Sequence, residues 1–578
     1  MIRMNRPSWF LGAALMIPIA AQGAVSIDDV VNAGSRIPTG LPSAGVAQGA
    51  VFAVLGKGLG PDSPVQASGF PLPTTDGLGG VTVQVSIGGS SVDAILVYAS
   101  ATQVVAILPS ATATGTGTVT VNNNGDMGTS AITVIPTAFG LFTAAGTGTG
   151  QVLAFNVSAA DGSTLANGLS QPVATGQNVI LNGTGLGAIT SDETQAGVMD
   201  VPSATPTVFI GGVQATVVSA GRGNCCGGIN ASYPVLPGIA GWDTITVTVP
   251  SGLQGCRVPV AVQIGNTVSN FGTISIAAAD GTCYDSTSAS AGQIQNVLNA
   301  SGTFKTAGFS LSRFGIKLSL PGGVSATSIS DSASATFQQY DLAGLQVSAD
   351  QLSVAQFGSC LVTQIRSSFS FSGPLPVGLD AGAVVNLSGP KGSKPLTKQS
   401  LGNYSAVLGS ATSTNTGVPG LPPIVSGSSY LDAGNYTFDN GSGGADVGAF
   451  KVTQVMPATV NWDNQDSISN VVRSQGLTVK WSGGDPASQV QIQGIGSMTL
   501  SKQVSVSAIF VCTEKASVGT FTVPSYVLLT LPQSSVIGGT PSGLLSLYSA
   551  TSQLITLPNV DYASFIALSG SAKNVNFQ

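Results

Sequence analysis

Two Asp- and Asn-containing segments in the C-terminal half, the first of them rich in Gly, carry the acidic side chains best placed to bind a cation. Asp439 and Asp446 bracket the run Asn-Gly-Ser-Gly-Gly-Ala, and Asp463 and Asp466 bracket Asn-Gln. Carboxylate oxygens on a Gly-rich backbone are hard ligands of the kind that calcium prefers. Neither segment matches an EF-hand loop, and Asp and Asn also form turns by bonding to their own backbone. We therefore expect turn chemistry first, with calcium as the alternative and no other cofactor.

Six cysteines suggest a disulfide framework, because an even number of thiols in an exported chain tends to pair. They are Cys225, Cys226, Cys256, Cys283, Cys360 and Cys512. Adjacent cysteines bond to each other only with a strained peptide. We therefore expect Cys225 and Cys226 to bond to Cys256 and Cys283, in an order that the sequence leaves open, and Cys360 to bond to Cys512 by elimination. Inert buried thiols and a Cys-only zinc site are the alternatives.

Histidine is absent from the chain, which excludes Ser-His-Asp and Cys-His triads and H-E-x-x-H zinc hydrolases. The only two glutamates, Glu193 and Glu514, fall in apparent loops of different domains. A glycosidase needs two carboxyl groups on either side of one bond. We predict no catalytic residue and no enzyme activity, and keep an Asp-based polysaccharide-active site in the C-terminal half as the alternative.

Composition limits the partners and the compartment. The net charge is −6 with only 19 Lys and Arg, so no basic stripe is available for a nucleic-acid backbone. Arg3 and Arg6 precede an apolar run over 9–21 and then small residues, the order typical of a secretory signal peptide over 1–24. Beyond residue 24 no run of about 18 apolar residues occurs, so we expect no transmembrane span and a secreted or cell-surface protein.

A duplicated unit organises the first half of the chain. Residues 50–60 and 177–187 are alternating strands that end in G-x-G-L-G, and the copies continue in register through an I-G-G turn and a strand that ends in Val-Pro or Leu-Pro. Short strands with turn signals every 8 to 12 residues, roughly, predict a β-sandwich in each copy. A nucleotide-binding G-x-G-x-x-G needs a helix after it, whereas more strand follows here. We therefore assign structural turns to Gly56, Gly58, Gly60, Gly183, Gly185 and Gly187.

These motifs resemble the IPT/TIG branch of immunoglobulin-like domains. The paired arrangement, the Cys225-Cys226 loop and the closing Cys283-Tyr284-Asp285 also look like a family of uncharacterised secreted proteins of soil bacteria, over about residues 25–285. The resemblance implies an exported protein with a first sandwich over 25–140 and a second, with disulfides, over 141–285. It implies no established activity.

The rest of the chain reads as a Ser/Ala-rich linker over 286–306 and a β-rich region over 307–578. Alternating apolar and polar residues predict strands near 309–320, 361–371, 384–387, 479–481, 490–495 and 504–511. The Gly/Ser/Pro-rich stretches 388–398 and 408–430 are expected to be loops. Periodicity does not decide between one and two sandwiches. Trp462 and Trp481 are predicted to pack in a core, with a sugar-stacking platform as the alternative.

The predicted fold class is thus all-β, with tandem immunoglobulin-like β-sandwiches followed by a larger β-rich C-terminal region. We interpret the chain as an extracellular structural or adhesive protein that binds a protein or a polysaccharide through its Ig-like domains, without nucleic acid and without catalysis. The sequence does not identify the ligand.

Overall fold

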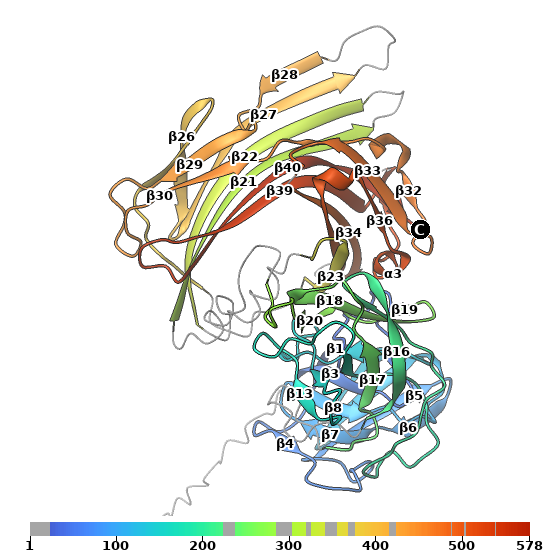
Figure 1. The fold of residues 1–578 in the computed structure, drawn as a ribbon. Coiled ribbons are helices and arrows are strands. Elements are labelled where there is room, and N and C mark those ends of the chain that lie inside the picture. The colour runs from blue at the N-terminus through green and yellow to red at the C-terminus, as the bar shows by residue number, and fades with distance from the viewer. Residues whose placement is uncertain are drawn as a thin grey trace, which may run out of the picture.

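The protein is all-β, as the sequence predicts, with two Ig-like sandwiches below one larger β-region (Figure 1). The structure is a computed structural model. It describes residues 24–223, 237–284, 303–319, 325–341, 355–367, 376–415, 424–486, 488–501, 504–537 and 539–578. The predicted signal peptide lies outside these residues, apart from Ala24. Within them, no helix has the length and apolar character needed to cross a membrane.

The first sandwich consists of two five-stranded sheets that pack face to face. One sheet has the order β1 (Ser26–Asn32), β3 (Val51–Lys57), β8 (Gln103–Ile107), β7 (Ile95–Ala99) and β4 (Val65–Gln66). The other has the order β2 (Val46–Ala47), β10 (Asp126–Ile135), β9 (Gly115–Asn123), β5 (Val81–Ile87) and β6 (Ser90–Asp93). Alternate residues of β5, all Val or Ile, are buried, as period-2 strands require when one face lies on a core.

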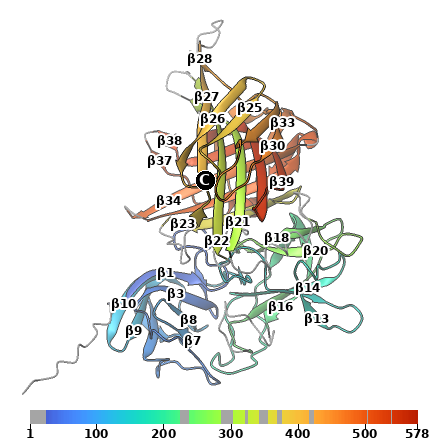
Figure 2. The same ribbon diagram turned by 90° about the vertical axis from the view of Figure 1, so that its left-hand side faces the viewer.

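The second sandwich repeats this design. Its strands form one continuous hydrogen-bonded ladder, because the β15–β16 hairpin connects its two sheets. Its strands are β11 (Gly140–Leu141), β12 (Ala154–Val157), β13 (Thr164–Ala166), β14 (Asn178–Thr184), β15 (Thr207–Ile210), β16 (Val213–Arg222), β17 (Asp243–Thr248), β18 (Gly255–Ile264), β19 (Thr267–Val268) and β20 (Gly272–Ile276). It has its own core of Val, Ile and Leu side chains. Figure 2 shows the two sandwiches side by side beneath the larger region.

Among the described residues, the C-terminal region contains a 15-stranded sheet. Its main path is β23 (Ser359–Arg366), β35 (Val504–Lys515), β34 (Gln489–Ser501), β39 (Gly543–Ile555), β40 (Tyr562–Phe577), β21 (Thr303–Ser319), β22 (Ser325–Asp341), β27 (Asn403–Asn415), β26 (Gly392–Ser400), β25 (Val384–Gly389), β29 (Gly434–Asp439) and β30 (Lys451–Met456). β24 (Val377–Gly378), β28 (Ile424–Ser428) and β32 (Asn470–Val471) pair at its sides. The long strands bend together into an arch (Figure 1).

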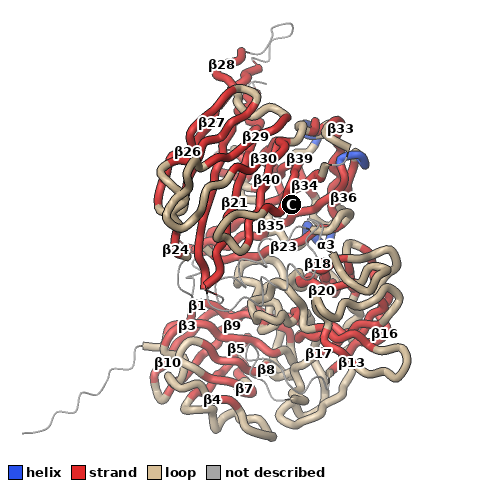
Figure 3. Tube along the Cα trace, turned by 60° about the vertical axis from the view of Figure 1, so that its left-hand side comes forward, coloured by secondary structure: helices blue, strands red, loops and turns tan. Residues whose placement is uncertain are grey.

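Smaller elements pack against this sheet (Figure 3). They are the sheet of β31 (Val460–Trp462), β33 (Leu477–Gly483) and β36 (Thr520–Val523), the hairpin of β37 (Val536–Ile537) and β38 (Thr540–Pro541), two 3-10 turns at Gln465–Ser467 and Ala516–Val518, and helix α3 (Ser525–Leu528). Trp462 and Trp481 lie directly opposite each other in the β31–β33 pair and are both buried. They pack in a core, as predicted.

Three sequence expectations about this region need correction. The strand β21 begins at Thr303, inside the expected linker, and residues 285–302 lie outside the described part of the chain. The expected loop at 388–398 is the β25–β26 hairpin, and the expected loop at 408–430 contains much of β27 and all of β28. In β26 Leu396 is the single buried side chain, so the sequence of this strand shows no alternation of apolar and polar residues.

One hydrophobic core joins the C-terminal region to both sandwiches. It contains side chains of β34, β35, β39 and α3, together with Ile37 and Leu41 from the first sandwich and Val268 and Phe271 from the second. The ring of Tyr526 stacks on Phe209, with ring centroids 3.9 Å apart. Burial raises the pKa of the Tyr526 hydroxyl. The described parts of the chain therefore form one packed body.

Candidate functional site

A buried ion pair organises the boundary between the two sandwiches. Arg222 ends β16 and Asp243 begins β17, and the two residues face each other in the antiparallel register. Both side chains are fully buried, and the guanidinium is bonded to the carboxylate. Arg222 also donates to the carbonyl oxygens of Gly187 (2.7 Å) and of Gly49 in the first sandwich (3.4 Å). Arg222 therefore connects Asp243 of the second sandwich to Gly49 of the first. Loss of either charged partner would leave a buried charge unpaired, which is costly.

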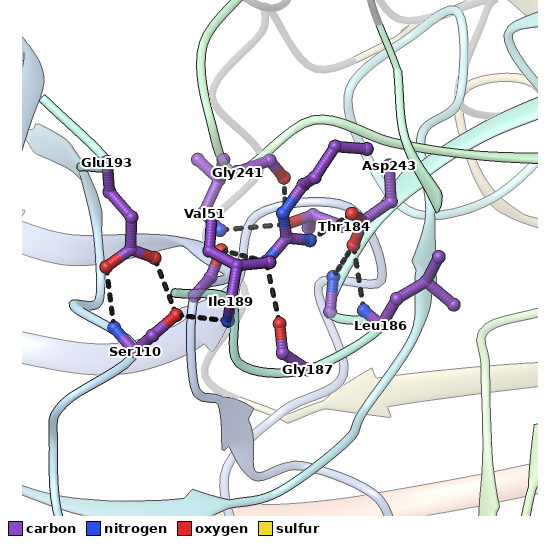
Figure 4. Close-up of polar contacts among 12 residues, drawn as sticks. Val51, Ser110, Thr184, Leu186, Gly187, Ile189, Glu193, Gly241 and Asp243 are labelled. Carbon is purple, nitrogen blue, oxygen red and sulfur yellow. Dashed lines mark hydrogen bonds and ion pairs between the residues drawn. The ribbon is translucent and has the colours of Figure 1, made fainter. Parts of the chain in front are cut away.

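The carboxylate of Asp243 holds the second G-x-G-L-G loop in place. Its Oδ2 accepts hydrogen bonds from the backbone N–H groups of Gly185 (2.6 Å) and Leu186 (2.8 Å). The bond from Leu186 is drawn in Figure 4. Burial raises the pKa of Asp243, and the charge of Arg222 and these N–H groups oppose that rise. The first copy of the repeat has Thr102 at the matching position and closes its loop through backbone bonds from Gly56 and Leu59. The loop therefore has a structural role, as expected.

Glycine is required in these loops for two separate reasons. Gly58, Gly185 and Gly187 have φ values of 64°, 110° and 118°, in the left-handed region that other residues rarely adopt. Gly56 and Gly183 instead lie against neighbouring backbone, where an added Cβ would come within 2.0 Å of the Ser26 oxygen and 2.4 Å of the Gly140 oxygen. At Gly60 a Cβ would lie 3.0 Å from the oxygen of Ser100.

A second polar cluster, centred on Glu193, lies beside the ion pair (Figure 4). Glu193 accepts hydrogen bonds from the backbone N–H (2.7 Å) and the hydroxyl (2.8 Å) of Ser110 in the first sandwich. The Ser110 hydroxyl in turn accepts a bond from the N–H of Ile189 (2.9 Å). Burial raises the pKa of Glu193, while the Ser110 bonds lower it. Sequence reasoning placed Glu193 in a loop but missed this cluster, because its partner is 83 residues away.

One of the two described disulfides confirms a predicted pair, and the other contradicts the two pairs predicted for Cys256 and Cys283. Cys360 is bonded to Cys512, directly across the β23–β35 ladder. Cys256 is bonded to Cys283, and not to a member of the Cys225-Cys226 pair. The reason is strand pairing: β18 and β20 are antiparallel neighbours, so the chain that leaves β20 returns to the beginning of β18. Cys225 and Cys226 lie outside the described residues.

The four aspartates proposed for calcium lie in two separate turns, and each has a protein partner. Asp439 accepts the N–H of Gly441 (2.7 Å) in a local turn. Asp446 accepts the backbone N–H of Asp380, and Asp463 accepts the hydroxyl of Ser482. Asp466 forms an ion pair with Lys317. The Lys317 ammonium lowers the pKa of Asp466. Across the described part of the chain no three acidic or cysteine side chains gather as a metal site. These contacts favour turn chemistry.

Other acidic side chains of the large sheet are held by cations. Asp331 is fully buried, receives two bonds of 3.0 Å from Arg313, and accepts the N–H groups of Tyr430 and Leu431. Asp432 bonds to Lys391 (2.8 Å), which lowers its pKa. Asp380 bonds to Lys398 (2.6 Å), and its pKa is lowered for the same reason.

We expect the protein to lose stability in acid, because protonation of these carboxylates breaks the ion pairs. Because the folded-state pKa values of Asp380 and Asp432 lie below the ordinary value, their stabilising contribution is present above about pH 4 and disappears as the pH falls through the lowered pKa values. The double variant Lys391→Met/Lys398→Met should therefore show a shallower fall of the thermal unfolding midpoint on the acid side. Thermal unfolding followed by circular dichroism between neutral and acid pH measures this.

The control for the acid prediction is Lys57→Met. The Lys57 side chain is exposed and has no ion-pair partner in the part of the chain that the structure describes. An acid-side slope identical in wild type and the double variant would contradict the prediction.

One face of the large sheet carries an array of free hydroxyl groups. In β22 the side chains alternate: Asp331, Ala333, Ala335 and Phe337 are buried, whereas the serines between them point to the opposite face. The register places hydroxyls of three adjacent strands side by side on that face. We call this set the hydroxyl face: Ser328, Ser330, Ser332, Ser410, Thr412, Ser426 and Ser428. All but the partly buried Thr412 are exposed.

Comparison with known proteins supplies no family. No protein-family model matches the chain, and no curated protein matches it. A surface glycan-binding protein of a Bacteroides ovatus mixed-linkage glucan utilization locus aligns at 10% identity over 84% of this chain and 94% of its own, with a TM-score of 0.12. Domains 5–6 of the S-layer protein SbsC align at 15% identity over 41% and 94%, with a TM-score of 0.12.

The extracellular region of plexin A4 aligns at 12% identity over 42% of this chain, with a TM-score of 0.14. The chain spans 17% of that plexin's length. Scores of this size carry no argument about function, which has to come from the residues described above.

Proposed function

We propose that the chain is an extracellular structural or adhesive protein that binds a partner through preformed surfaces and does not catalyse a reaction. Its sandwiches are of the IPT/TIG type, and residues 1–24 direct its export to the cell surface or the medium. The partner is an extracellular protein or a polysaccharide.

The observation that carries this proposal is the close packing of the three β-units against one another. The shared core, the buried Arg222–Asp243 pair and the bonds between Glu193 and Ser110 hold the sandwiches and the large sheet together. Arg366 of β23 adds an ion pair of 2.7 Å to Asp29 of the first sandwich. A surface that is rigid before it binds loses little conformational entropy on binding. Two disulfides fit a protein that works in an oxidising compartment.

The alternative, a polysaccharide-active enzyme with an Asp-based site, has less support. A general acid in a glycosidase needs a carboxyl group whose pKa is raised. The carboxylates Asp380 and Asp432 have lowered pKa values because lysines bind them, which keeps them ionised. Such groups are suited to holding turns in place.

The test is a binding screen with the full-length, oxidised protein against glycan arrays and whole cell surfaces, with and without calcium. Full-length protein is needed because deletion of either half would expose the shared core. We expect binding that chelation of calcium does not change, with no release of soluble sugar from any polysaccharide. Release of sugar would instead support the enzyme, and absence of all binding would contradict the proposal.

A further inference from the structure

The hydroxyl face carries no charged side chain among the described residues of its strands. The charged residues of β21 and β22 with described side chains are Lys305, Arg313, Lys317 and Asp331, and all lie on the opposite, packed face according to the register. Strands β27 and β28 contain no charged residue at all. A charged ligand would find no counter-ion on the hydroxyl face.

The hydroxyl groups of this face are also without partners. None of the seven side chains makes a hydrogen bond to any described residue, whereas exposed serine pairs elsewhere do, such as Ser86 and Ser91 at 2.7 Å. The register pairs Ser330 with Ser410 and Ser410 with Ser428, while Ser328 pairs with Thr412 and Thr412 with Ser426. Neighbouring strands are about 4.8 Å apart, and alternate residues of a strand are about 6.8 Å apart. The hydroxyls therefore form a two-dimensional grid of donors and acceptors.

Apolar side chains border this grid. Val407 of β27 pairs with Ser332 and is 77% exposed. On β21, Phe314 pairs with Ser330 and Ile316 with Ser328. The ring centroids of Phe314 and Tyr548 are 6.0 Å apart. Both residues pair with Gly570 of β40, which lies between their strands. The surface thus combines free hydroxyls with apolar and aromatic side chains and carries no charge.

We infer that the hydroxyl face binds an uncharged polysaccharide. A neutral sugar polymer presents hydroxyl groups at repeated intervals and apolar C–H faces, which match the free hydroxyls and the apolar border. Each neutral hydrogen bond contributes little, so affinity comes from several contacts along one polymer chain. This inference rests on the proposed function and names its ligand class and its surface. Because no charge is involved, binding should not weaken as ionic strength rises.

The variant that tests the site is Ser328→Ala/Ser330→Ala/Ser332→Ala. It removes the three hydroxyls that β22 contributes to the grid and leaves the buried face of β22 unchanged. The matched control is Ser86→Ala/Ser91→Ala, which removes two exposed hydroxyls of the first sandwich. A second test variant, Ser330→Glu, places a charge within the grid. Circular dichroism and thermal unfolding confirm that each variant is folded.

The probes are cellulose, chitin and a soluble neutral β-glucan, with alginate and pectate as acidic counterparts, measured by pull-down and affinity electrophoresis. We expect wild type and the control to bind at least one neutral polymer at low and high salt, and the triple variant and Ser330→Glu to bind it at least about tenfold more weakly.

The possible results separate the site from the function. Equal binding of a neutral polymer by wild type and the triple variant would overturn the site and leave the proposed function standing. Preference for the acidic polymers, or binding to a cell-surface protein alone, would overturn the ligand class. Failure to bind any polymer or cell surface would overturn both this inference and the proposed function.

Discussion

Replacement of both Cys360 and Cys512 by alanine is expected to lower the free energy of unfolding by about 5 kcal/mol in the chain-entropy description of disulfides. The two cysteines are separated by 152 residues, so the bond closes a long loop and restricts the unfolded chain strongly. The bond also fastens β23, at one end of the large sheet, to β35. Urea denaturation of the oxidised proteins measures the loss.

The other described disulfide is the matched comparison. Cys256 and Cys283 are 27 residues apart, so the double alanine variant at these positions should lose less, between about 3 and 4 kcal/mol. A loss for the Cys360/Cys512 variant that is equal to or smaller than this one would contradict the ranking.

The substitution Arg222→Met is expected to lower the free energy of unfolding by about 3 to 5 kcal/mol, because it leaves Asp243 buried without its cation. The carbonyl oxygens of Gly187 and Gly49 lose a donor as well. Trp242 reports on this region, since its indole N–H bonds to Asn182 and its ring stacks on Phe142 at 4.3 Å. Urea denaturation followed by tryptophan fluorescence is therefore the measurement.

The Arg222→Met deficit should also depend on pH. Removal of the guanidinium removes a charge that opposes the raised pKa of Asp243. A carboxyl group whose folded-state pKa is raised contributes stability at low pH and loses it as the pH rises, so the deficit should shrink in mild acid.

Lys317→Met is the control for an ordinary ion pair. Its partner Asp466 is 77% exposed, and such pairs contribute at most about 1 kcal/mol. If Arg222→Met cost no more than Lys317→Met at neutral pH, the buried pair would not have the role assigned to it.

The sequence predicted the features that depend on local pattern. The duplicated unit marked both sandwiches, and the G-x-G-L-G glycines were assigned to turns because their spacing follows a strand and precedes another strand. Trp462 and Trp481 were expected in a core and lie there.

Features that depend on distant pairing were missed. The Cys256–Cys283 bond follows from the β18–β20 register, which no local signal reveals. The Arg222–Asp243 pair had one available clue: the second copy of the repeat carries Asp243 where the first carries Thr102. The part of the hydroxyl face that lies on β27 and β28 was predicted to be loop, because serine and glycine have turn propensity when their strand partners are unknown.

The place of β40 in the sheet has a consequence for how the protein acquires its structure. β40 runs parallel to β21 and antiparallel to β39, and a hydrogen bond joins Lys305 to Asp561 across 256 residues of chain. Synthesis from the N-terminus produces β21 long before β40, so one edge of β21 has no native neighbour until β40 is made. Pairings of such long range form slowly and leave strand edges open to other chains. The sandwiches are able to mature early, whereas the second half is committed to late assembly, and its aggregation hazard falls in the interval before residues 562–577 arrive.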